Sequence, residues 1–130
     1  MANKDTTLFT EKRRAKRIIA PSGTTALFLS STGSLDTVCV GDISVNGMLL
    51  CGYNSEEKYP ANSLIYNIYV DIPPCKSSAG KRTCILIDRG KVVRSLYDQA
   101  SKTFCYGIEL MYKSSYTKNI IEGLVKMSNQ

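Results

Sequence analysis

The sequence predicts an all-β (mainly β) domain that ends in one amphipathic helix. Apolar and polar residues alternate through residues 64–72 and 104–112, and a period of two is typical of half-buried strands. Three further β-rich segments bounded by turn residues lie at 24–31, 37–52 and 83–99. Six or so short strands followed by a single helix favour a small antiparallel barrel or sandwich.

The alternation also assigns a face to the side chains of the clearest strands. In residues 64–72 the even-numbered positions are all apolar, so we expect them on one face by strict alternation. The even-numbered positions of residues 104–112 are apolar in the same way and predict a second one-sided strand. Residues 83–99 are expected to form one strand that bends or turns at Arg89–Gly90 and then resumes.

The period changes only near the carboxyl end of the chain. Two apolar pairs in residues 115–127 are spaced four residues apart, Ile120 with Leu124 and Ile121 with Val125. Charged side chains occupy the opposite side of the same segment, which is the pattern of an amphipathic helix. We therefore expect a terminal helix that docks on the strands.

Length and composition limit the class of protein. The chain has 130 residues, of which 43% are hydrophobic and 22% charged, as expected for one folded domain. It contains no apolar run of the roughly 20 residues that a membrane span requires, and its first residues lack the apolar core of a secretory signal. These features predict a cytoplasmic protein without a membrane span.

The cysteine and histidine content argues against an enzyme and against a metal site. Five cysteines are present without any C-x-x-C pair, and there is no histidine. Ser-His-Asp and Cys-His catalytic sets are therefore excluded, and no spacing of acidic residues suggests a working pair. We expect no catalytic residue, no metal and no cofactor, and we expect the thiols to be reduced core residues.

The net charge of +6 is concentrated at the amino terminus. Six basic and two acidic side chains fall within residues 1–17, so most of the excess lies in this short segment. A local concentration of positive charge attracts an anionic partner such as a phosphate ester. The sequence thus divides into a flexible basic arm, residues 1–20, and a barrel with its helix, residues 21–130.

Within the arm, Arg13 and Arg17 form the pattern R-x-x-x-R, with Arg14 between them. Taken alone, this pattern is most often a solvated basic segment. The guanidinium group can also donate paired hydrogen bonds to a phosphate or to the O6/N7 edge of guanine, and it stacks on flat rings. Two such groups on a flexible segment could close over a guanine nucleotide.

A second pattern, D-x-S-x-x-G, is formed by Asp42, Ser44 and Gly47. Asn46-Gly47 between apolar runs favours a type I′ hairpin turn with positive φ at both residues, and in that interpretation the other two are outward polar residues. A carboxylate can also accept the N1–H and N2–H donors of guanine, and a serine hydroxyl can bond a base or a phosphate. The turn and the ligand contact are compatible.

In this order the two patterns resemble the PilZ domain, a bacterial receptor module for cyclic dimeric GMP (c-di-GMP). A third element, "GKVVRSLYDQASKTFCYGIEL" at residues 90–110, resembles the strand pair of that family, with Leu110 where the family usually has Phe. The likeness covers about residues 11–127. It implies a six-stranded antiparallel PilZ-type β-barrel with a C-terminal α-helix.

The resemblance also implies a ligand and a role for each motif residue. Arg13 and Arg17 would bind phosphates and guanine edges, Asp42 and Ser44 would contact guanine, and Gly47 would shape the turn. Arg14 has no position in the family pattern and is an additional candidate for a stacking or phosphate contact. No reaction on the ligand is implied.

The implied mechanism is a change of conformation that a second protein detects. Neutralisation of the arm by c-di-GMP would draw it onto the barrel, and a component of the motility, pilus or exopolysaccharide machinery would recognise the new surface. The sequence leaves open the number of ligands, the formation of a homodimer, the partner, and the roles of Arg89 and Arg94.

Two other functions remain as alternatives. A PilZ-like module that contacts proteins without binding c-di-GMP would keep the fold, although the intact motifs argue against it. A barrel that binds a nucleic acid polymer would need basic and aromatic residues interleaved on a strand face, and here the charge lies in the arm instead.

Overall fold

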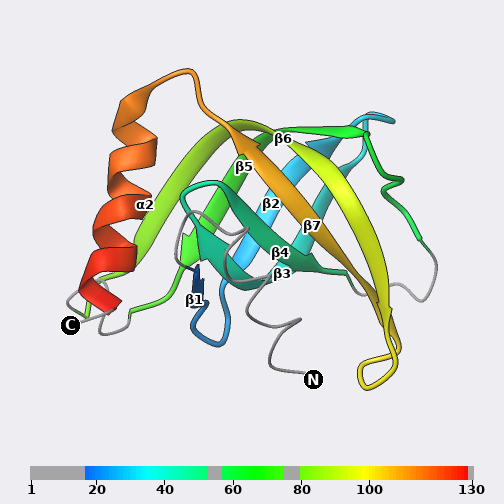
Figure 1. Ribbon diagram of the computed structural model, residues 1–130, viewed down its shortest axis with the longest axis horizontal. Coiled ribbons are helices and arrows are strands. Elements are labelled where there is room, and N and C mark those ends of the chain that lie inside the picture. Colours follow the sequence, from blue (N-terminus) through cyan, green and yellow to red (C-terminus); the bar gives the residue numbers. More distant parts are fainter. Residues whose placement is uncertain (1–16, 53–56, 75–79, 129–130) are drawn as a thin grey trace, which may run out of the picture.

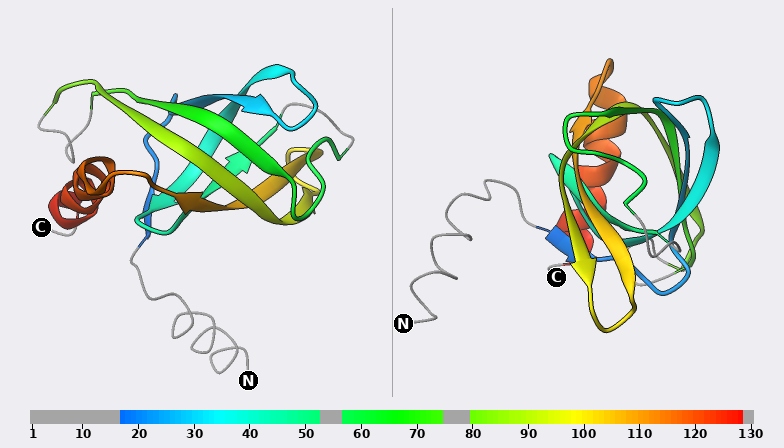
Figure 2. Two further views of the ribbon diagram at one scale, coloured as in Figure 1. Left: turned by 90° about the horizontal axis from the view of Figure 1, so that it is seen from above. Right: turned by 90° about the vertical axis from the view of Figure 1, so that its right-hand side faces the viewer.

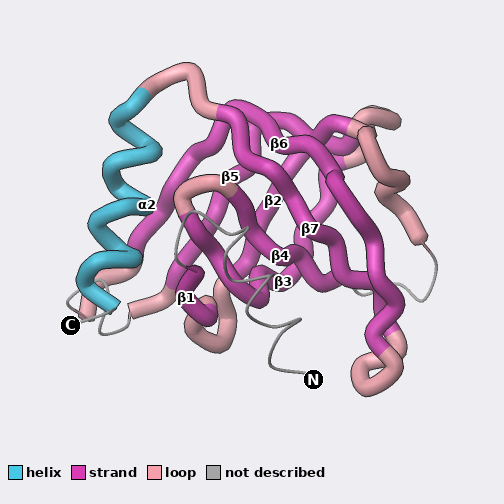
Figure 3. Tube along the Cα trace, in the orientation of Figure 1, coloured by secondary structure: helices cyan, strands magenta, loops and turns pink. Residues whose placement is uncertain are grey.

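The computed structural model describes residues 17–52, 57–74 and 80–128, which form seven strands and one helix (Figure 1). Figure 3 shows that strand accounts for most of the described chain and that the helix lies at its carboxyl end. The elements are β1 (Arg17–Ile19), β2 (Thr25–Ser30), β3 (Leu35–Ser44), β4 (Gly47–Cys51), β5 (Leu64–Ile72), β6 (Thr83–Asp98), β7 (Thr103–Met111) and α2 (Ser115–Ser128).

Six of these strands close into a barrel. The order in the sheet is β1-β3-β2-β5-β6-β7-β4, and a further pairing of β3 with β4 closes the ring. Every pairing is antiparallel. The right-hand view of Figure 2 shows the strands curving around a common interior. Closure pairs the backbone groups that the edge strands of an open sheet would leave unpaired. Of the two predicted architectures, the structure is therefore the barrel and not the sandwich.

Strand β1 lies outside the ring and pairs with the end of β3 that β2 does not reach. Arg17 is the Cα partner of Ser44 and Ile19 that of Asp42, and the amide of Ala20 donates to the carbonyl of Gly41 at 3.0 Å. Residues 17–19, which the sequence assigned to the arm, are thus a strand. Residues 1–16 lie outside the described residues, so the division at residue 20 stays a prediction.

The barrel interior is apolar, and it corrects one assignment of the sequence pattern. In β5 the buried residues are Ile65, Ile68, Val70 and Ile72, so strict alternation of the even-numbered positions from residue 64 is wrong. Asn67 has φ of 51°, and the pairing with β2 shifts register at this point. A β-bulge adds one residue to the strand, so the side chains before the bulge point to the opposite face from the one that alternation predicts. Ile65 is therefore buried in place of Leu64 and Tyr66. In β7 the expected alternation is confirmed, with Tyr106, Ile108 and Leu110 buried.

Strand β6 runs without interruption through Gly90, although the sequence suggested a bend or turn there. A Cβ atom at Gly90 would lie 2.6 Å from Cγ2 of Ile108, so glycine is required for the close approach of β6 and β7. The irregularity in pairing comes later, between Val92 and Arg94, where the register with β7 shifts.

Helix α2 is confirmed and packs beside the barrel, as the left-hand view of Figure 2 shows. Ser114 caps its first turn by accepting the amide of Tyr116 at 3.1 Å. Ile121, Leu124 and Val125 are buried, and the helix contacts β1, β3 and β6. In the described part of the chain, no helix has the length and apolar character needed to cross a membrane.

Candidate functional site

The candidate site is built on the β3–β4 hairpin and on strand β1 beside it. Asp42 and Ser44 belong to β3, and Gly47 begins β4. Because Arg17 is paired with Ser44, the fold brings the second arginine position of R-x-x-x-R next to the D-x-S-x-x-G segment. Two motifs separated by 24 residues in the sequence therefore become neighbouring backbone segments.

A bulge in β3 turns Asp42 toward the outer face. Val40 pairs with Leu50 in the core, whereas Asp42 pairs with Leu49, so Gly41 is the extra residue. A Cβ at Gly41 would lie 3.2 Å from Cδ2 of Leu49, which leaves little room for a larger residue. The bulge places Asp42 half-buried on the outside of the barrel while Ile43 enters the core.

Ser44 holds the turn that follows. Its side chain is only 3% exposed, its hydroxyl donates to the carbonyl of Gly47 at 3.2 Å, and it accepts the Gly47 amide at 3.1 Å. Neither Asn46 nor Gly47 has a positive φ, so the expected type I′ turn is wrong. The turn is instead closed by the two hydrogen bonds between the Ser44 hydroxyl and the backbone of Gly47.

Gly47 is required because the turn packs directly on β7. A Cβ at Gly47 would lie 2.7 Å from the carbonyl oxygen of Ile108, and the amide of Leu110 donates to the carbonyl of Asn46 at 2.9 Å. The hydroxyl of Tyr112 donates to the carbonyl of Val45 at 2.6 Å. Burial of this phenol, with the charge of nearby Glu122, raises the pKa of Tyr112 well above its usual range.

The outer face beside the hairpin carries a row of paired residues that ends in an arginine. Asp42 pairs with Leu49, Leu49 with Gly107, and Gly107 with Arg94. Atoms of the Arg94 side chain lie 3.1 Å from the position that a Cβ of Gly107 would take, so this side chain crosses β7 at the glycine. We call Asp42, Leu49, Gly107 and Arg94 the outer row.

Sequence reasoning left the role of Arg94 open. The signal that could have placed it is the glycine at position 107, which gives a long side chain from the neighbouring strand room to lie across β7. Arg89 is also exposed, but it pairs with Tyr66 and Met111, away from the outer row. Ile19, the partner of Asp42 on β1, is 89% exposed.

The remaining predicted site residues belong to the arm. Arg13 and Arg14 lie outside the described residues, and only the backbone of Arg17 is described. Their contacts stay predictions. No group of three or more Cys, Asp or Glu side chains that could hold a metal ion occurs within residues 17–52, 57–74 and 80–128.

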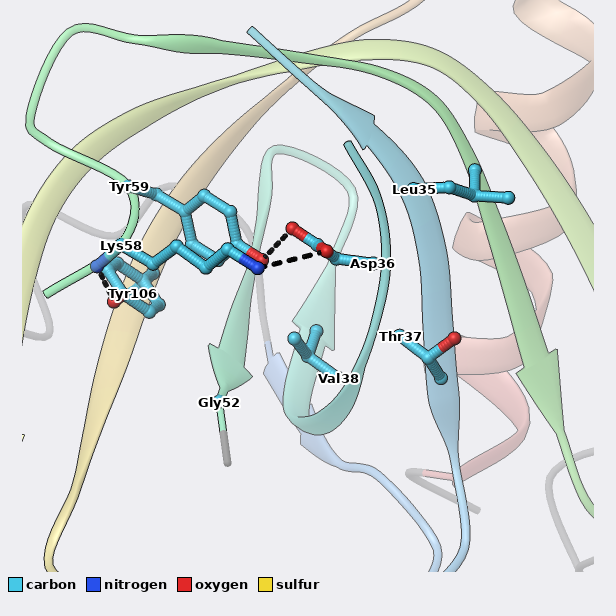
Figure 4. Close-up of a pocket in the computed structure, with 8 residues that line it drawn as sticks. All are labelled: Leu35, Asp36, Thr37, Val38, Gly52, Lys58, Tyr59 and Tyr106. Carbon is cyan, nitrogen blue, oxygen red and sulfur yellow. Dashed lines mark hydrogen bonds and ion pairs between the residues drawn. The ribbon is translucent and has the colours of Figure 1, made fainter. Parts of the chain in front are cut away.

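A pocket of about 240 Å³ lies near the opposite end of β3, where its polar groups bond one another (Figure 4). The Asp36 carboxylate accepts the Tyr59 hydroxyl at 2.5 Å and the Lys58 ammonium at 3.1 Å. The amide of Lys58 donates to the hydroxyl of Tyr106 at 2.8 Å. Asp42 is six positions beyond Asp36 in β3, about 20 Å along a strand. This pocket is therefore separate from the outer row.

We expect Ser44→Ala to lower the free energy of unfolding by about 1–3 kcal/mol in the absence of any ligand, because it leaves the buried Gly47 amide without its acceptor. Urea denaturation followed by circular dichroism measures this change. Ser34→Ala is a serine control, because the Ser34 hydroxyl bonds the side chains of Ser30 in β2 and Asp36 in β3 and, among the described residues, no backbone amide. An equal stability of Ser44→Ala and the wild type would contradict the role of Ser44 in the turn.

The fold and the site together define a closed antiparallel barrel with a terminal helix and, on its outer face, a row of residues with Asp42 at one end and Arg94 at the other. No protein-family model matches the sequence, and no curated protein matches it. Solved structures match over most of the chain, and those described next share this architecture.

YcgR from Escherichia coli in complex with c-di-GMP aligns with a TM-score of 0.70 at 14% identity, over 91% of this chain and 46% of that one. The separate PilZ domain of YcgR from Escherichia coli, with c-di-GMP, aligns with a TM-score of 0.66 at 13% identity. The alignment covers 91% of this chain and 92% of that domain. The Bacillus subtilis inhibitor of motility, MotI/DgrA, aligns with a TM-score of 0.69 at 12% identity. The alignment covers 91% of this chain and 52% of the MotI chain.

The chain therefore has the PilZ fold, and the predicted six-stranded PilZ-type barrel with its helix is confirmed, with β1 as one extra strand. It spans about half the length of the YcgR and MotI chains and nearly all of the separate PilZ domain.

Proposed function

We propose that this protein is a bacterial receptor for c-di-GMP that changes conformation on binding and signals to a partner protein. The observation that carries the proposal is the pairing of β1 with β3, which sets the end of R-x-x-x-R beside Asp42 and Ser44. The PilZ fold supports it, because YcgR, which shares this fold, was solved in complex with c-di-GMP.

Each residue has a distinct role in the proposal. Arg13 and Arg17 bind the phosphates and guanine edges of the dianionic ligand, with Arg14 as an additional cation. Asp42 accepts the N1–H and N2–H donors of a guanine from its outward position on β3. Ser44 acts mainly by holding the turn through its hydrogen bonds to Gly47. Its position two residues after Asp42 in β3 would let its hydroxyl add a contact to the same guanine.

The signal follows from the position of β1. Residues 1–16 immediately precede β1 in the sequence. A ligand that neutralises the arm and holds it against the outer row would therefore change the surface around β1. Helix α2 contacts β1 and β3, and it lies where a partner protein could detect that change. The proposed location is the cytoplasm, and the proposed chemistry is binding alone.

The test is titration calorimetry of the full chain with c-di-GMP, beside Arg13→Ala, Asp42→Ala and linear GMP. We expect saturable binding by the wild type, loss of binding in both variants, and no binding of GMP. Asp42→Ala should keep the wild-type circular dichroism spectrum, since Asp42 lies outside the apolar core. The spectrum of Arg13→Ala is recorded beside it. Absence of binding by a folded wild type would overturn the proposal and favour a PilZ-like module that contacts proteins only.

Arg94→Ala should weaken c-di-GMP binding by roughly 10- to 100-fold, the loss of one charge-assisted hydrogen bond. The side chain crosses Gly107 within the outer row, and among the described residues it has no ion-pair partner to hold it elsewhere. Arg89→Ala is the matched control, an exposed arginine on the same strand away from the row. Equal affinities of the two variants would exclude Arg94 from the site.

A further inference from the structure

Three cysteines from three neighbouring strands lie in one row across the barrel. Cys39 on β3 is the Cα partner of Cys51 on β4, and Cys51 is the partner of Cys105 on β7. Their neighbours Val38, Leu50 and Tyr106 are buried in the core, so the cysteines alternate to the outer face. Cys105 is nevertheless buried, as expected, whereas Cys39 and Cys51 are half-buried. The expectation of core cysteines is wrong for Cys84, which is exposed, and Cys75 lies outside the described residues.

The second pair in this row has the geometry of two thiols in contact. The Sγ atoms of Cys51 and Cys105 are 3.1 Å apart. The amide of Gly52 donates to the carbonyl of Phe104, which makes Cys51 and Cys105 a non-hydrogen-bonded pair. Such pairs have Cα atoms about 4.5 Å apart and the closer side chains, within the range that a disulfide spans.

We propose that Cys51 and Cys105 are a site of reversible oxidation, at which a hydroperoxide converts the two thiols into one cross-strand disulfide. The peroxide transfers oxygen to one sulfur, which becomes a sulfenic acid, and its remaining part leaves as water or an alcohol. The second sulfur then attacks the first and displaces hydroxide, which takes up the second thiol proton and leaves as water. Two electrons pass from the sulfurs to the peroxide.

The surroundings of Cys51 set the conditions for this reaction. Burial raises its pKa to about 12, with the hydrogen bond and charge of Cys105 on β7 and the charges of Cys39 on β3 and Asp98 on β6 adding to the rise. The thiolate is the reactive form, so the raised pKa makes the oxidation of Cys51 slow at neutral pH. Close contact then favours disulfide formation over further oxidation, because a sulfenic acid at either sulfur meets the second thiol at once.

The disulfide would join β4 to β7 two residues away from the outer row. Leu49 precedes Cys51 on β4, and Gly107 follows Cys105 on β7. Oxidation would therefore fix the two middle strands of that row to each other. This inference does not depend on c-di-GMP being the ligand.

The experiment treats the full chain with hydrogen peroxide and maps the products by mass spectrometry of peptides without reduction. We expect a loss of about 2 Da, recovered on addition of dithiothreitol, and a linked peptide pair containing Cys51 and Cys105. Cys51→Ser and Cys105→Ser should each abolish this product, whereas Cys84→Ser should leave it unchanged. A disulfide that joins other cysteines, or oxidation of Cys51 to a sulfinic acid without the linked pair, would overturn the proposal.

Discussion

Gly47→Ala is expected to lower the free energy of unfolding by about 3 kcal/mol, the upper part of the usual range for forcing an atom into a packed site. The added Cβ would meet the carbonyl oxygen of Ile108 at 2.7 Å. That oxygen is backbone and cannot rotate away, so the β3–β4 turn must move off β7 and lose the bond between Asn46 and Leu110.

Gly123→Ala is the matched control for this prediction. Gly123 lies in α2, and a Cβ there would meet no atom within 4 Å. Alanine should therefore stabilise the helix by about 1 kcal/mol through helix propensity alone. Denaturant titration of both variants gives the comparison. If Gly47→Ala were as stable as the wild type, the close packing of the turn on β7 would be refuted.

Asp36→Asn should lower the stability of the protein by about 2 kcal/mol at neutral pH and by much less near pH 3. Partial burial raises the pKa of Asp36, but hydrogen bonds from Tyr59, Lys58 and Ser34 and the charge of Lys58 outweigh it. The net effect lowers the pKa below its ordinary value of 3.8. A lowered pKa in the folded state contributes stability above pH 3.8 that is lost as the pH falls through the folded value.

Denaturation measured at several pH values between 2.5 and 7, on the order of one unit apart, would test this difference. Asp71→Asn is the control, because Asp71 pairs with Arg82, which is more than half exposed, and exposed ion pairs contribute little. A constant difference between Asp36→Asn and the wild type over the whole range would show that the charge of Asp36 does not stabilise the fold.

The strands and the helix could be predicted from the sequence because their periods are local properties. The two bulges could not. Asn67 and Gly41 each occupy an ordinary place in an alternating pattern, and only the pairing with a neighbouring strand shows that one residue is extra. Strand β1 was missed for a related reason, since three residues are too few to show a period and the adjacent charges suggested an arm.

The candidate site was predictable as a set of motifs but not as an arrangement. The order of Arg13, Arg17, Asp42, Ser44 and Gly47 in the sequence gives no register, and the pairing of β1 with β3 is a tertiary contact. The burial of Ser44 in its own turn was also hidden, because a serine that binds a ligand and one that holds a loop look alike in a sequence. Arg94 became a candidate site residue only because the structure places its side chain across Gly107.

Helix α2 contacts both β1 and β3, the strands that carry the proposed receptor site. Energetic coupling between two binding surfaces is reciprocal: a factor by which one ligand strengthens the other applies equally in the opposite direction. A protein that recognises α2 with β1 held in place would therefore raise the affinity for the dinucleotide by the same factor. The apparent sensitivity of the receptor would then be set partly by the abundance of its partner.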